Sequence, residues 1–89
     1  MQQHEAFMCL VEERKFQDNK WGTIEDGPGA HSVGEWILLI EAELAEAKEA
    51  LIKGGTGRNS VLSEITQVGA LALACLEQHG HRDIAGRAV

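Results

Sequence analysis

Apolar positions along this chain recur at the spacing of α-helices. A first helix is predicted from about Gln3 to Asn19, where Phe7, Leu10 and Val11 form a short apolar stripe. The segment from Trp21 to His31 is rich in glycine and contains the single proline, so we expect a loop there. Alternating β-branched runs, which would indicate strands, are missing from the sequence. The pattern therefore predicts an all-α fold.

The second helix has the clearest start. Ser32 followed by Glu35 forms a capping box, in which each side chain satisfies a free backbone N–H of the first turn. Gly54 and Gly55 suit the left-handed backbone that often ends a helix. Between these limits the apolar positions keep a helical spacing. They are Val33, Trp36, Ile37, Ile40, Leu44, Ala47 and Leu51.

A third helix is predicted from Asn59 or Ser60 to about His79, with Gly80 ending it. Residues 68–76 of this helix are apolar on every side, and such a helix must be buried on all sides. Three helices from one chain do not easily surround it. We therefore expect a helical bundle of three main helices per subunit that a second subunit completes, in a homodimer or a tetramer.

The size and charge of the chain exclude several classes of protein. Its 89 residues make one domain, which we place at residues 1–80, with residues 81–89 as a loose tail. A net charge of −6 argues against a general nucleic-acid binder and against binding to anionic membranes. The longest apolar stretch is too short to span a bilayer, and the N-terminus lacks the features of a signal peptide. Cys9 and Cys75, without CxxC spacing, indicate reduced, buried thiols in a cytoplasmic protein.

Two pairs of oxygen-bearing side chains stand one helical turn apart on the second and third predicted helices. Glu43 and Glu46 form one pair, and Glu64 and Gln67 form the other. Residues three apart lie on nearly the same helix face, so two such helices packed side by side would bring three carboxylates and an amide together. Oxygen ligands of this kind hold Mg²⁺ beside substrate phosphates. The alternative is an ordinary solvated acidic face, which describes Glu41 and Glu49 well.

Three blocks of the sequence carry a resemblance to a known family. They are residues 13–22, ERKFQDNKWG, with a Q-D-x-K-W-G stretch; residues 36–47, WILLIEAELAEA, similar to a W-x-x-x-L-x-E-E-x-x-E-x helix; and residues 62–68, LSEITQV, similar to an E-L-x-[DQ]-V helix. In order and spacing, the blocks resemble the MazG-like nucleoside triphosphate pyrophosphohydrolases of the all-α NTP pyrophosphatase superfamily. The resemblance covers most of the chain.

The resemblance implies Mg²⁺-dependent, or Mn²⁺-dependent, hydrolysis of a nucleoside triphosphate to a monophosphate and pyrophosphate. It places Glu43, Glu46 and Glu64 at metal-ligand positions, with Glu43 and Glu46 as catalytic residues. Gln67 stands where most members carry an aspartate ligand. Ala42 stands at the first position of an adjacent glutamate pair, which is associated with a general base. These departures leave a second interpretation open, a catalytically degenerate helical dimer that binds a nucleotide or a protein partner.

Four more side chains are candidates for holding the substrate. Lys20 and Arg58 are cations suited to phosphate. Trp21 and Trp36 have flat faces on which any base can stack. Since Trp36 falls on the apolar stripe of its helix, core packing is the favoured interpretation for that residue. Base and sugar preference stay open.

Overall fold

Helices make up nearly all of the regular structure in this computed structural model, which describes residues 1–25 and 27–80. The elements are α1 (Gln3–Trp21), α2 (Val33–Lys53), the short 3₁₀ helix η1 (Gly57–Asn59) and α3 (Val61–His79). No strand occurs in the described ranges, so the predicted all-α class is confirmed. The predicted tail, residues 81–89, lies outside the described residues.

Local capping sets the ends of α2 and α3 close to where the sequence predicts them. The Ser32 hydroxyl accepts a hydrogen bond from the Glu35 backbone N–H at 3.1 Å, and the Glu35 carboxylate accepts one from the Ser32 N–H at 2.7 Å. Gly54 ends α2 in the left-handed region, with φ 71° and ψ 43°. The Ser60 hydroxyl caps α3 by accepting from the Ser63 N–H at 3.2 Å. The turn η1 between them was not predicted.

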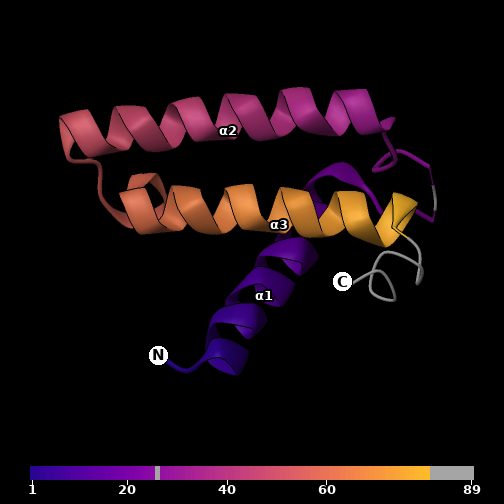
Figure 1. The fold of residues 1–89 in the computed structure, drawn as a ribbon, viewed down its shortest axis with the longest axis horizontal. Helices are drawn as coiled ribbons and strands as arrows, with labels where there is room; N and C mark the ends of the chain where they lie inside the picture. The colour runs from indigo at the N-terminus through magenta and orange to yellow at the C-terminus, as the bar shows by residue number, and fades with distance from the viewer. Residues whose placement is uncertain (26, 81–89) are drawn as a thin grey trace, which may run out of the picture.

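α3 lies between the other two helices. It packs along α2 and against α1, whereas the backbones of α1 and α2 do not approach each other in the described part of the chain. Figure 1 shows α2 and α3 running side by side in opposite directions, with α1 crossing α3 steeply. A Cβ at Gly69 would stand 2.8 Å from Leu10 Cδ2, so glycine at this point of α3 lets α1 come close. A space lined by all three helices is left on one side of α3.

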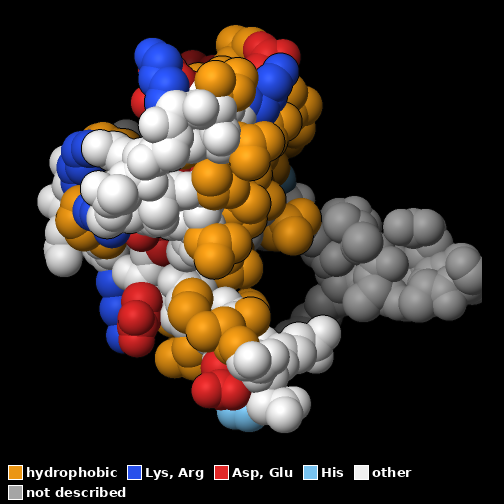
Figure 2. Space-filling view, turned by 90° about the vertical axis from the view of Figure 1, so that its left-hand side faces the viewer, with side chains coloured by type: hydrophobic (Ala, Val, Ile, Leu, Met, Phe, Trp, Pro, Cys, Tyr) orange, Lys and Arg blue, Asp and Glu red, His pale blue; other side chains and the backbone are white. Residues whose placement is uncertain are grey.

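The core of a single copy is small. Trp36, Leu71 and Ala74 form its buried cluster. Residues 68–76 are only partly covered, because Leu76 remains 60% exposed. Hydrophobic side chains gather in a band on the face shown in Figure 2. The exposed large apolar side chains of α2 and α3 are Val33, Ile37, Leu38, Leu39, Leu44, Leu51, Ile52, Leu62, Ile65 and Leu76.

Two other expectations from the sequence can be compared with the fold. Cys9 and Cys75 are both free, as expected for reduced thiols, but each is only half-buried. Cys75 packs against the small core cluster, which a single copy does not cover completely. None of the described helices is long and apolar enough to cross a membrane.

Candidate metal centre

Three glutamates from two helices meet where α2 packs on α3. Glu43 and Glu46 lie one turn apart on α2, and Glu64 lies in the first turn of α3. One carboxylate oxygen from each residue lies within 4.8 Å of the other two. The structure thus brings together the three carboxylates that the sequence spacing singled out.

This glutamate cluster is shielded from solvent at Glu43 and Glu64, is exposed at Glu46, and is short of hydrogen-bond donors. Glu64 is only 5% exposed, and Glu43 is half-buried. The Oε2 atoms of Glu43 and Glu64 are both buried, and neither accepts a hydrogen bond from the described part of the chain. Leaving a buried polar atom without a partner costs about 1–3 kcal/mol, and more when the group is charged. The cluster is therefore unfavourable until protons or a cation neutralise it.

The protonation of Glu43 reflects this crowding. Burial, followed by the neighbouring carboxyl groups of Glu64 and Glu46, raises the pKa of Glu43 from 4.5 to about 8. At neutral pH Glu43 therefore holds a proton. A divalent cation would displace that proton, and the unpartnered oxygens would then serve as ligands of the cation. An all-oxygen set with two unsatisfied atoms fits a hard cation such as Mg²⁺.

Two hollows follow one another along α2 and meet at Glu46. The larger, which we call the aromatic pocket, has a volume of about 400 Å³ and is lined by Glu43 and Glu46 among other residues. Its flat and apolar lining comes from Trp21, Pro28, His31, Trp36, Leu39 and Leu71. The smaller, which we call the polar hollow, has a volume of about 300 Å³. Its lining is Glu46, Glu49, Ala50, Lys53, Gly55, Asn59 and Glu64.

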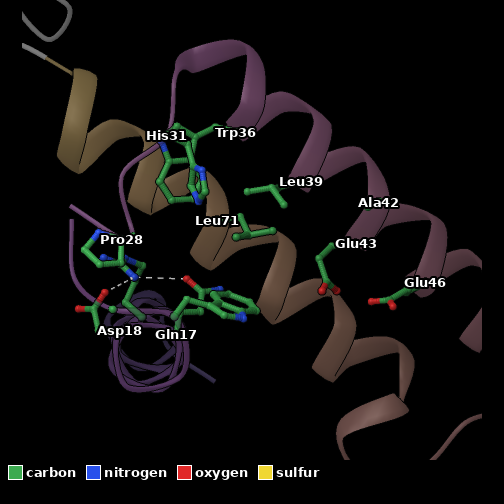
Figure 3. Close-up of a pocket in the computed structure, with 14 residues that line it drawn as sticks. Gln17, Asp18, Pro28, His31, Trp36, Leu39, Ala42, Glu43, Glu46 and Leu71 are labelled. Carbon is green, nitrogen blue, oxygen red and sulfur yellow. Dashed lines mark hydrogen bonds and ion pairs between the residues drawn. The ribbon is translucent and has the colours of Figure 1, made fainter. Parts of the chain in front are cut away.

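The end of α3 fixes one wall of the aromatic pocket. The Gln78 Oε1 atom accepts hydrogen bonds from the Trp36 indole N–H and from the His31 backbone N–H, each at 3.0 Å. The His79 ring donates from Nε2 to the His31 carbonyl oxygen at 2.7 Å. His31 and Trp36 meet edge to face, with ring centroids 4.7 Å apart (Figure 3). Trp36 is 4% exposed, so the expectation of core packing is confirmed, and the residue also lines the pocket.

The opposite wall belongs to α1, whose polar residues were not predicted to be part of the site. Arg14 donates from Nε to Glu77 at 2.8 Å and from Nη1 to Gln17 Oε1 at 3.3 Å, and it pairs with Asp18 at 3.0 Å. Arg14 and Gln17 are both buried. The spacing of Arg14, Gln17, Asp18 and Trp21 places them on one face of α1, and this was the available signal. His31 was likewise missed as a pocket residue, and no periodic pattern marks it.

The other predicted substrate residues are spread over the surface. Trp21 lines the aromatic pocket, whereas the Lys20 Nζ lies 5.1 Å from the centre of the Trp21 ring and Lys20 lines neither hollow. Arg58 donates from Nη2 to both carboxylate oxygens of the buried Glu13, at 3.0 and 2.9 Å. Its guanidinium also lies 4.2 Å from the centre of the Phe16 ring. In this arrangement Arg58 ties η1 to α1 and lines neither hollow.

The two departures from the family pattern differ in their position. Gln67 donates from Nε2 to the Arg58 carbonyl oxygen at 3.3 Å, and its side chain lines neither hollow. Ala42 is exposed and lines the aromatic pocket beside Glu43. Glu41, the neighbouring acid, is exposed and lines neither hollow. Position 42 therefore lines the pocket without a carboxylate, and the neighbouring Glu41 does not supply one there.

Compared with family models, with curated proteins and with solved structures, the chain shows no match.

Proposed function

We propose that this protein is a Mg²⁺-dependent nucleotide pyrophosphohydrolase, which cleaves a nucleoside or deoxynucleoside triphosphate to the monophosphate and pyrophosphate. The observation that carries the proposal is the glutamate cluster at the edge of an aromatic pocket, with buried, unpartnered oxygens on Glu43 and Glu64. The pocket volume of about 400 Å³ falls within the range of small-molecule sites. The MazG-like sequence blocks imply the same reaction.

Different residues of the site would bind the cation and the nucleobase. Glu43, Glu46 and Glu64 would hold the cation, either Mg²⁺ or Mn²⁺. That ion, when bound, neutralises phosphate charge and lowers the pKa of a coordinated water. Trp36 and His31 offer flat surfaces for a nucleobase. The Trp36 ring is held by its hydrogen bond to Gln78, and the His31 ring meets it edge to face, before any ligand arrives.

Proton transfer has few candidates in the pocket. Of the described residues that line it, only Asp18, Glu43 and Glu46 carry a carboxyl group. Asp18 is paired with Arg14 at 3.0 Å, which occupies one of its oxygens. Glu43 and Glu46 therefore remain the candidate catalytic residues, and the missing carboxylate at Ala42 predicts slow turnover.

A second candidate function has two observations in its favour. At Ala42 the pocket presents a methyl group where the resembling family has an acid, and Gln67 is engaged with the Arg58 carbonyl. A catalytically degenerate helical dimer that binds a nucleotide or a protein partner would tolerate both features. Such a protein would still bind a ligand in the aromatic pocket but would not hydrolyse a nucleotide.

We also propose that the protein works as a homodimer, or as a tetramer of two dimers. Ile37, Leu44 and Leu51 recur every seven residues on α2 and are 58%, 49% and 71% exposed. That spacing forms a straight apolar seam of the kind through which helices associate. An 89-residue chain with so small a core gains stability when a second copy covers the seam. Leu44→Glu should give a monomer by light scattering, and an unchanged oligomer would reject this seam as the interface.

Pyrophosphate release from a panel of dNTPs and NTPs, with Mg²⁺, Mn²⁺ or EDTA, tests the proposed reaction. Glu46→Gln and Glu64→Gln should abolish metal-dependent release while the helical content measured by circular dichroism stays unchanged. Glu41→Gln, an exposed acid on the same helix as Glu46, is the matched control. Folded wild-type protein that hydrolyses none of the triphosphates would favour the binding module instead. Turnover that survives both substitutions would show that the glutamate cluster is not the site.

A further inference from the structure

The polar hollow has no assigned role in the proposed reaction, although it adjoins the glutamate cluster directly. Glu46 lines both hollows, and Glu64 lines the polar hollow. Glu64 is 5% exposed, and its Oε2 has no hydrogen-bond partner in the described part of the chain. A group bound at the cluster therefore has access to the aromatic pocket on one side and to the polar hollow on the other.

The two hollows suit opposite ends of a nucleotide. The aromatic pocket offers rings and apolar side chains, on which a base can stack. The polar hollow is lined by no aromatic residue in the described ranges, and it contains the Lys53 ammonium group and the Asn59 amide beside the carboxyl groups of Glu46, Glu49 and Glu64. An ammonium group binds phosphate as a point charge, and an amide NH₂ donates hydrogen bonds to phosphate oxygens.

The spacing along α2 also fits a chain of phosphates. Lys53 lies seven residues beyond Glu46, which places the two on the same side of the helix, about 10 Å apart along its axis. A diphosphate group and an extended lysine side chain together cover such a distance. Arg58, one of the two cations that the sequence offered for phosphate binding, is instead held by the buried Glu13.

We propose that the polar hollow is the subsite for the terminal phosphates of the nucleotide, with Lys53 as their cation and Asn59 as a donor. The inference rests on the proposed function and gives the substrate a direction along α2. The base lies against Trp36, the scissile bond lies at the glutamate cluster, and the departing pyrophosphate lies against Lys53.

Glu49 competes with phosphate for the same ammonium group. The Lys53 Nζ pairs with Glu49 at 2.7 Å, and the two side chains are 70% and 59% exposed. An exposed pair of this kind contributes little to stability, so a phosphate group with more than one negative charge can displace the carboxylate. The two partners should therefore affect pyrophosphate binding in opposite directions, which a purely structural ion pair would not do.

Calorimetric binding of inorganic pyrophosphate in the presence of Mg²⁺ tests the subsite without requiring turnover. Lys53→Ala should weaken pyrophosphate binding by about tenfold, equivalent to about 1.4 kcal/mol. Glu49→Gln should tighten it, because Lys53 is then unopposed. Binding of a nucleoside monophosphate should change little in the Lys53→Ala variant, since its base and single phosphate reach only the pocket and the cluster. Lys48→Ala and Glu41→Gln make the same charge changes on exposed parts of α2 that line neither hollow.

The outcomes separate this inference from the proposed reaction. Wild-type protein that does not bind pyrophosphate, or Lys53→Ala binding it as tightly as wild type, would overturn the subsite. Equal effects of Lys53→Ala and Lys48→Ala would also overturn it, because they would reflect net charge alone. Pyrophosphate binding that depends on Lys53, in a protein that hydrolyses no triphosphate, would support the subsite and reject the enzyme.

Discussion

Replacing Glu64 with glutamine should stabilise the metal-free protein, although it removes a proposed ligand of the cation. Glu64 is 5% exposed, and its Oε2 accepts no hydrogen bond from the described residues. Glutamine has nearly the same shape and carries no charge. Its amide can donate to the unpartnered Oε2 of Glu43, which lies in the same cluster. The substitution therefore removes a destabilising charge and adds a donor.

The size of the effect follows from the spacing of the carboxylates. Two unit charges 4.8 Å apart repel by about 3 kcal/mol at an effective dielectric constant of about 20. Glu43 holds a proton at neutral pH, so the main repulsion that Glu64 experiences comes from Glu46, which is exposed and partly screened. We therefore expect a gain of about 2 kcal/mol, or a Tm increase of about 8–16 °C for a domain of this size.

Thermal unfolding followed by circular dichroism measures this gain, with EDTA or with saturating Mg²⁺ and at one fixed protein concentration. Wild type should gain about 2.7 kcal/mol when Mg²⁺ reaches about 100 times its dissociation constant, whereas Glu64→Gln should gain much less. Glu41→Gln should behave as wild type in both conditions. A Glu64→Gln variant less stable than wild type in EDTA would show that Glu64 stabilises the fold. A wild-type Tm that does not change when Mg²⁺ is added would show that the cluster holds no cation.

Three other substitutions or conditions give independent tests. Because the pKa of Glu43 is raised to about 8, the stability that Glu43 contributes to the metal-free protein should be fully present below about pH 4.5 and lost as the pH rises through about 8. The Mg²⁺ affinity measured by calorimetry should rise over the same pH range. A stability and an affinity that do not change with pH would contradict this assignment. Ala42→Glu places a carboxylate in the aromatic pocket beside the cluster and should raise kcat by about 100-fold, and an unchanged kcat would argue against a base at this position. Gln78→Leu removes the acceptor of two N–H groups, so it should weaken nucleotide binding and alter the near-UV circular dichroism of Trp36. Gln78→Glu keeps an acceptor and should resemble wild type. An equal loss of nucleotide affinity in both variants would reject this positioning role.

The helices could be predicted from the sequence because helix formation is largely a local matter. A backbone hydrogen bond in a helix joins residues four apart, and a cap is decided within one turn, so Ser32, Glu35 and Gly54 mark the ends of α2 by themselves. The same local geometry placed Glu43 and Glu46 on one face. Two adjacent amphipathic helices joined by a short connection then pack side by side, which brought Glu64 to them.

The surroundings of the cluster were decided only by the tertiary structure. Gln78 reaches Trp36 across 42 positions, and Arg14 reaches Glu77 across 63. Such contacts depend on how steeply α1 and α2 cross α3, and periodicity within one helix carries no information about that angle. Arg58 shows the consequence, since the sequence offered it as a phosphate ligand and the fold places it against Glu13, 45 positions away. Local spacing determined which residues share a helix face, and the packing of the three helices determined which faces enclose a site.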